Sequence, residues 1–245
     1  MTTLIVTNEQ RRAAQVAGVT ALLAIAIVVF GNYVLLNPLI VPGKATETAQ
    51  NILAHERAFR LTIVCFLAYS LNNLVLVSAL YVVLKPVNRG LALASALCRF
   101  VFAILWLFGS LQMLVALRLL GHSSYLQAFE PDRLQALARV TIAGTFDDYY
   151  VGLPFFSLAL TICGYLWLKS NYIPRSLSWF GIISSGWCVI CAFVYLLFPA
   201  FAKPVNPYWF DSPMALFEVI LSFWLLFKGL RSGSSFEPAS ASTDR

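Results

Sequence analysis

Apolar residues are arranged along the chain in six long runs that are separated by short polar segments. The runs lie approximately at residues 13–36, 60–84, 91–120, 146–168, 176–198 and 212–230. A helix needs about 20 predominantly apolar residues to cross the hydrocarbon core of a bilayer. Each run reaches that length once tilt and frayed ends are allowed. The pattern therefore predicts an all-α, polytopic bundle of six transmembrane helices.

The composition supports a membrane-embedded chain. Of the 245 residues, 60% are hydrophobic and 11% are charged, whereas soluble domains average about 25% charged residues. The first apolar run is too long for a signal-peptide core and lacks a clear cleavage site, so we expect it to remain as a helix. Residues 1–231 are predicted to form the transmembrane domain. Residues 232–245 are Ser-rich and polar, and we expect them to be disordered.

Basic residues predict the orientation of the bundle. One side carries Arg11, Arg12, Lys85, Arg89, Lys169, Arg175, Lys228 and Arg231. Several of these are packed into very short connections, at residues 85–90 and 169–175. Because short cytoplasmic loops are enriched in Lys and Arg, we expect this side and both termini to be cytoplasmic in a multi-pass protein of the cell membrane. The basic residues form no single stripe, so the expected partner is the lipid bilayer and not a nucleic acid.

The segments on the opposite side are longer and carry structural signals of their own. Residues 44–59 place apolar side chains near helical spacing, which predicts a short amphipathic helix: Ala49, Ile52, Leu53 and Phe59. Residues 129–144 begin a second helical pattern, with Pro131 at a favourable first-turn position. Residues 198–213 hold four prolines and an aromatic cluster. The sequence therefore predicts structured outer loops.

Four polar residues inside the apolar runs form a predicted central layer. Arg99 and Glu218 each lie ten residues from a cytoplasmic basic residue, which places both about 15 Å deep. Asn72 and Asn73 lie roughly 18–20 Å deep by the same measure. An ionisable group in a spanning helix must face the bundle and find a partner, so Glu218 is expected to pair with Arg99. This pair is either structural or part of a substrate or proton site.

A second polar layer is predicted nearer the outer surface. Asp147 and Asp148 begin the fourth run, and Gln112, Arg60 and His55 are expected at similar height. Carboxylates also suit the positive end of a helix, so these residues fit a helix cap that Arg60 neutralises. They also fit a cation site or a site for a metal-bridged diphosphate. The chain has no second Asp-rich motif, which weakens the diphosphate hypothesis.

Other common site chemistries find little support. The five cysteines all lie in apolar runs, where packing explains them. Two of them form a C-x-x-C pattern, Cys188 and Cys191, with no nearby histidine. His55 and His122 are not paired by spacing. No nucleophile elbow, Gly-rich phosphate loop or H-E-x-x-H motif occurs. We therefore expect no metal and no cofactor.

Four segments together resemble a known family. They are IVPGKATETAQNILAHERAFRL, LYVVLKPVNRGLALASALCRF, GYLWLKSNYIPR and FEVILSFWLLFKGL, in that order, within residues 11–230. They are similar to a large bacterial family of small polytopic membrane proteins catalogued as a domain of unknown function. The resemblance places Arg60, Arg89, Arg99 and Glu218 on family positions. It implies the fold and no activity. The absence of histidine between residues 141 and 169 departs from the family pattern.

Three classes of function remain open on the sequence. The protein binds or transports a small or lipid-like ligand, acts as an intramembrane enzyme on a lipid or isoprenoid, or is a structural or partner protein without a ligand. The catalytic candidates for the enzyme are Glu218, Asp147 and Asp148. For the ligand, we predict an outward-facing polar cavity. Its mouth would hold Arg60, Gln112, Asp147 and Asp148, and its floor would hold Asn72, Asn73, Arg99 and Glu218.

Overall fold

The computed structural model describes residues 6–121, 124–198, 200 and 208–231, and these residues are helical with no strand among them. The α-helices are α1 (Asn8–Val29), α2 (Ala45–Ala54), α3 (Glu56–Leu84), α4 (Arg89–Leu120), α5 (Pro131–Ser170), α6 (Arg175–Leu197) and α7 (Tyr208–Phe227). Shorter elements are η1 (Phe30–Leu36), η2 (Asn37–Leu39) and η3 (Ser124–Leu126). Six helical segments are long and apolar enough to cross a membrane. The predicted all-α bundle with six spans is confirmed.

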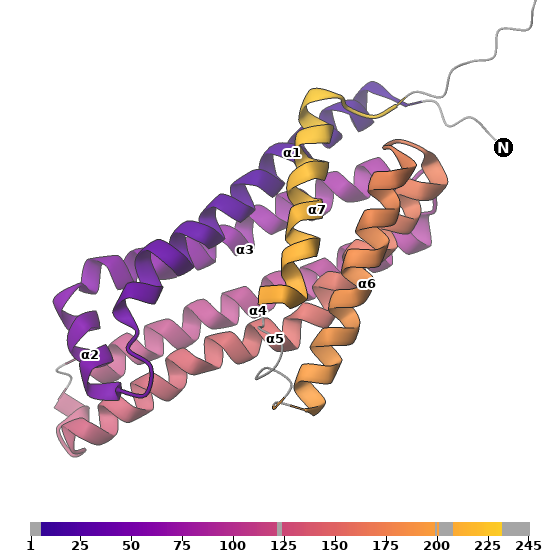
Figure 1. Cartoon of the computed structure of the whole chain (residues 1–245). Coiled ribbons are helices and arrows are strands. Elements are labelled where there is room, and N and C mark those ends of the chain that lie inside the picture. Colours follow the sequence, from indigo (N-terminus) through magenta and orange to yellow (C-terminus); the bar gives the residue numbers. More distant parts are fainter. Residues whose placement is uncertain (1–5, 122–123, 199, 201–207, 232–245) are drawn as a thin grey trace, which may run out of the picture.

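Four of the helices run along the long axis of the molecule (Figure 1). These are α1, α3, α4 and α5, whereas α6 and α7 are steeper and flank one half of the bundle, with α7 between α1 and α6. The start of α1 and the end of α7 lie at the same end of the molecule, and α2 lies at the opposite end. The protein therefore has one end that holds the short basic connections and another that holds the longer segments.

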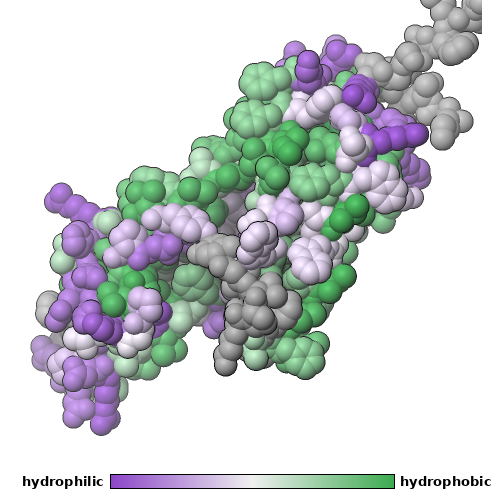
Figure 2. All heavy atoms as spheres, in the orientation of Figure 1, coloured by the Kyte–Doolittle hydropathy of each residue, from purple (hydrophilic) through white to green (hydrophobic). Residues whose placement is uncertain are grey.

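The surface has the distribution expected of a membrane protein. Figure 2 shows hydrophobic residues across the middle of one face and hydrophilic residues gathered at both ends. Large apolar side chains are exposed along the spans, such as Val64, Leu71, Leu97 and Ile183. Exposed apolar surface of this extent requires a non-aqueous environment. The chain is thus a multi-pass membrane protein.

Local sequence signals set the helix ends near the basic connections. The Thr7 hydroxyl accepts from the backbone N–H of Gln10, whose side chain accepts in return from the Thr7 N–H, so α1 begins with a capping box. Asn88 caps α4 by accepting from the Leu91 N–H at 3.0 Å. At the end of α5, Asn171 adopts a left-handed conformation with φ of 55°. The Asn88 and Asn171 caps lie in the short turns that reverse the chain between α3 and α4 and between α5 and α6.

The long segments at the other end are only partly as predicted. The expected amphipathic helix is α2, which buries Ala49 and Ile52 but leaves Leu53 exposed. Residues 131–170 form one continuous helix of 40 residues, not an outer helix followed by a separate span. No breaking residue separates the two patterns, so the helical backbone simply continues. The aromatic, proline-rich segment lies largely outside the described residues, as does the tail after residue 231.

Cysteine labelling tests the predicted orientation of the two ends. The expected result is that Thr46→Cys, in exposed α2, reacts with a membrane-impermeant maleimide in intact cells. Gly90→Cys, exposed at the start of α4, should react only after permeabilisation, because it lies among the basic connections. The wild-type chain, whose cysteines all lie in the spans, provides the baseline. Labelling of Gly90→Cys in intact cells would place the termini outside.

Candidate functional site

The predicted central ion pair is present between α4 and α7. Arg99 Nη2 donates to Glu218 Oε1 at 2.7 Å, and the two side chains are only 5% and 12% exposed. Each charge thereby offsets part of the cost of burying the other, and the loss of either partner would leave an uncompensated buried charge. The expected ion pair between Glu218 and Arg99 is therefore present in the structure.

The rest of the Arg99 side chain is also held in place. Its Nε donates to Asn73 Oδ1 at 3.3 Å, and its guanidinium lies 4.8 Å from the centroid of the Phe156 ring. The Asn73 amide donates in turn to the Tyr69 carbonyl at 3.0 Å. A void of only about 20 Å³ lies beside the pair, which is room for about one water. This closed geometry favours a structural role for the pair over a substrate site.

Asn72 does not join this layer. Its amide donates to the Thr20 carbonyl of α1 at 2.7 Å, away from Arg99. Consecutive positions on a helix point about 100° apart, so Asn72 and Asn73 serve different helix contacts. The two residues lie at similar depth in the membrane, as the sequence indicated, but their side chains leave α3 in different directions and contact different helices.

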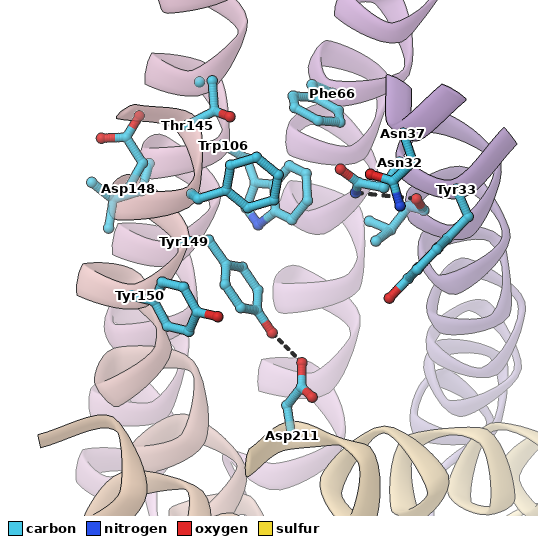
Figure 3. A pocket seen from close by; sticks show the side chains of 14 residues that line it. Asn32, Tyr33, Asn37, Phe66, Trp106, Thr145, Asp148, Tyr149, Tyr150 and Asp211 are labelled. Atoms are coloured by element: carbon cyan, nitrogen blue, oxygen red, sulfur yellow. Dashed lines mark hydrogen bonds between the residues drawn. The ribbon is translucent and has the colours of Figure 1, made fainter. Parts of the chain in front are cut away.

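A larger cavity lies elsewhere in the bundle (Figure 3). Its lining includes residues near the end of the first span and in the first half of α3, the two elements that flank α2 in the chain. Its volume is about 270 Å³, and residues from five parts of the chain line it. The linings come from α1 with η1 and η2, from α3, from α4, from α5 and from the first turn of α7. The polar and aromatic members are Asn32, Tyr33, Asn37, Phe66, Trp106, Thr145, Phe146, Asp148, Tyr149, Tyr150 and Asp211.

Two carboxylates line the cavity, and each has a neutral donor. Asp148 accepts from the Gln112 side-chain amide, and Asp211 accepts from the Tyr149 hydroxyl. Neither takes part in an ion pair with another described residue. Both carboxylates are therefore oriented by hydrogen bonds without being neutralised within the described part of the chain.

Aromatic rings form much of the remaining wall. The Trp106 ring centroid lies 4.8 Å from that of Phe66 and 6.2 Å from that of Tyr149. The Tyr149 and Tyr150 ring centroids are 5.6 Å apart. The indole N–H of Trp106 is buried and has no hydrogen-bond partner among the described residues. Aromatic faces around a few polar groups are characteristic of small-molecule sites.

A π-helical segment shapes one wall. Residues Phe30–Leu36 follow α1 directly in the π form, and the Asn37 N–H donates to the carbonyl of Asn32, five residues earlier. This wider turn brings Asn32, Tyr33 and Asn37 to the cavity. Segments of π-helix are rare and occur frequently at functional sites. Nothing in the apolar pattern of this run signals the change in winding, so the sequence did not identify these residues.

The outer polar layer is only partly assembled as predicted. Gln112 and Asp148 come together beside the cavity, as expected. Arg60 does not: its side chain is 59% exposed and pairs with Glu56 at 2.6 Å on the same helix. Asp147 is exposed, and His55 contacts the Asn51 carbonyl. The cap that Arg60 would neutralise is therefore not formed in this structure.

The predicted floor also lies elsewhere. Asn72, Asn73, Arg99 and Glu218 are absent from the lining of the cavity. The two layers are separate sites and do not form one continuous cavity, because the Arg99–Glu218 pair and its neighbours satisfy one another and pack closed. The sequence pattern did not predict that the first span would line the cavity. It also did not identify three residues of the lining: Trp106, Tyr149 and Asp211. Trp106 had a signal, since it lies two helical turns from Arg99 on the same face.

Comparison with known proteins agrees with this geometry at the level of family. No curated protein and no solved structure matches the chain. One family model covers all six candidate spans in whole or in large part. The chain therefore belongs to the family described as Domain of unknown function (DUF4386), whose model matches residues 16–229.

Proposed function

We propose that this membrane protein binds, and in doing so helps to transport, a small or lipid-like ligand in the aromatic cavity. The observation that carries the proposal is the cavity itself, about 270 Å³ among helices that otherwise pack closely. Protein interiors contain few voids larger than a water molecule. A space of this size accommodates an aromatic ring or short alkyl group with a small polar head, close to the smaller ligand pockets of proteins.

The position of the cavity suggests the side from which the ligand enters. Asp148 lies nine residues beyond Arg139, about 14 Å along α5, and α5 begins at the end of the molecule that carries α2 (Figure 1). Under the orientation predicted from the basic residues, that end faces away from the cytoplasm of the cell membrane. The ligand would then arrive from the outer solution or the outer leaflet.

The lining supports an amphiphilic ligand over a purely polar one. Phe66, Trp106 and Leu105 offer apolar surface, whereas Asn32 and Asp211 offer polar groups on opposite sides (Figure 3). A ligand with one apolar and one polar end would satisfy both. The Arg99–Glu218 pair, by contrast, has no room for a ligand, so binding is assigned to the cavity alone.

Fluorescence quenching of Trp106 tests binding directly. Two brominated probes are titrated into protein in bilayer nanodiscs: (4-bromobenzyl)trimethylammonium and its uncharged carbon isostere, 1-bromo-4-(2,2-dimethylpropyl)benzene. Bromine quenches an indole that it contacts, and the Trp106→Phe variant gives the background from the other tryptophans. We expect saturable, Trp106-dependent quenching by one or both probes.

A cavity-filling variant provides the structural control. A Cβ at Gly109 would lie 3.8 Å from Phe66 and from Thr145, an ordinary contact, so Gly109→Leu extends into the cavity without forcing the backbone apart. It should abolish the saturable quenching. Gly186→Leu, on α6 with no atom within 4 Å of the added Cβ, should leave it unchanged. If neither probe quenches Trp106 saturably, or if Gly109→Leu has no effect, the cavity is not a binding site.

A further inference from the structure

We propose, building on the cavity as a binding site, that its ligand is an organic cation. An ammonium group would contact Asp211, and its apolar substituent would lie against Trp106 and Tyr149. Three features of one cavity support this ligand: two carboxylates that form no ion pair with any described residue, aromatic walls, and a volume of about 270 Å³.

The charge of the cavity is the first feature. Its described lining holds two carboxylates and no Lys, Arg or His. Glu218 is another acid deep in the spans, and it forms an ion pair with Arg99 at 2.7 Å. In that case a buried carboxylate is balanced by a basic side chain of the bundle. A carboxylate in a low-dielectric site without a countercharge is costly. A cationic ligand would supply a countercharge that no described residue provides.

The orientation of the side chains is the second feature (Figure 3). The Tyr149 hydroxyl is turned toward Asp211 and donates to it, which fixes the carboxylate at the base of the cavity. The Asp211 carboxylate also accepts a backbone hydrogen bond, and these two donors still leave part of its acceptor capacity unused. Asp148 lies at the margin, turned away from Asp211 and held by Gln112. Asp211 is therefore the contact residue, and Asp148 adds negative potential from a distance.

The aromatic walls are the third feature. A cation within about 6 Å of a ring centroid is attracted by the negative face of the ring, more strongly when water is excluded. In Figure 3, Tyr149 and Tyr150 lie nearest to Asp211, and Trp106 lies on the other side of Tyr149 along the same wall. The described part of the molecule already uses this interaction elsewhere: the Arg99 guanidinium lies 4.8 Å from the Phe156 ring centroid, and the Arg231 guanidinium lies 5.0 Å from the Trp224 ring centroid.

A metal ion fits the cavity less well. No three His, Cys, Asp or Glu side chains gather into a possible metal site within the described residues. Calcium needs six to eight oxygen ligands and magnesium demands octahedral geometry, whereas this lining is largely apolar. A volume of about 270 Å³ also exceeds what one coordinated ion fills. An organic cation uses both the charge and the space.

A helix-capping role for Asp211 is the competing explanation. Asp211 lies in the first turn of α7, where a carboxylate interacts favourably with the helix dipole. That role needs neither a cavity nor aromatic walls, and it predicts that Asp211→Asn changes the stability of α7 without discriminating between charged and uncharged ligands. The two explanations therefore differ in a measurable way.

The test compares the two brominated probes across three Asp→Asn variants. Asp211→Asn should weaken the trimethylammonium probe by about tenfold or more, because it removes the coulombic attraction between the quaternary ammonium and a carboxylate in a site of low dielectric constant. It should change the affinity of the uncharged isostere by less than about twofold, since that probe makes no such contact. Asp148→Asn should weaken the cation by about two- to threefold through the lost potential. Asp147→Asn removes the same charge from an exposed neighbour outside the lining and should change neither probe.

A competition on the wild-type protein covers the case in which Asp211→Asn fails to fold. Benzyltrimethylammonium, without bromine, should displace the brominated cation, and benzenesulfonate should not. The cation inference is wrong, and the cavity stands as a neutral-ligand site, if both probes respond equally to Asp211→Asn or if the anion competes as well as the cation. Absence of Trp106-dependent quenching by either probe would instead overturn the binding site itself.

Discussion

Removal of the Glu218 carboxylate is expected to destabilise the protein by about 3–5 kcal/mol, because it leaves the Arg99 guanidinium buried without a countercharge. Arg99 is 4% exposed, and its remaining contacts to Asn73 and Phe156 do not supply a negative charge. Thermal unfolding of Glu218→Met in detergent measures the loss. The prediction concerns stability and not binding, since the pair is separate from the aromatic cavity.

The double variant gives the decisive comparison. Arg99→Met with Glu218→Met replaces both charges by flexible apolar side chains of similar length, and it should recover most of the stability that Glu218→Met loses. The exposed pair Arg60–Glu56 is the matched control, and removing Glu56 there should change stability by about 0.5 kcal/mol or less. If the single and double variants at the buried pair lose the same amount, the lone-charge explanation fails.

Adding one methyl group at Gly18 is expected to destabilise the contact between α1 and α7 by about 1–3 kcal/mol, as overpacking typically does. The new Cβ would lie 2.9 Å from the Ser222 carbonyl oxygen and 2.8 Å from Leu226 Cγ. A backbone oxygen has no free rotation with which to avoid the clash, so α7 must move. Small residues at such positions allow transmembrane helices to approach closely.

The readout for Gly18→Ala is again thermal unfolding. Gly186→Ala is the matched control, because both changes lie inside helices and gain the same intrinsic helix propensity of about 1 kcal/mol. Around Gly186 nothing lies within 4 Å of the added Cβ, so that variant should be neutral or more stable. A displacement of α7 would also move Glu218 and Asp211, which α7 carries. If Gly18→Ala and Gly186→Ala unfold at the same temperature, then α1 and α7 accommodate the extra methyl group without loss of stability, and the prediction is wrong.

Amino-acid order alone determined the spans, the two ends of the bundle and the central ion pair. Six apolar runs must be buried in lipid as helices, since helices satisfy their own backbone hydrogen bonds. A buried Arg99 requires a negative charge at the same depth in the membrane. Glu218 lies at that depth, because each of the two residues is ten positions from a basic residue on the side predicted to be cytoplasmic. These predictions succeed because burying a charge or exposing apolar surface to water costs much free energy. Such costs restrict where apolar and charged residues occur along the sequence, so the sequence pattern alone shows them.

The tertiary structure decided how the polar residues divide into two sites. Helical rotation turned Asn72 to α1 and Asn73 to Arg99. The local pairing of Arg60 with Glu56 kept it at the surface. Tyr149 of α5 and Asp211 of α7 are 62 residues apart, and the packed bundle brings their side chains within hydrogen-bonding distance. Depth along a helix can be counted from sequence, but rotation, winding and helix neighbours follow from packing among all the helices at once.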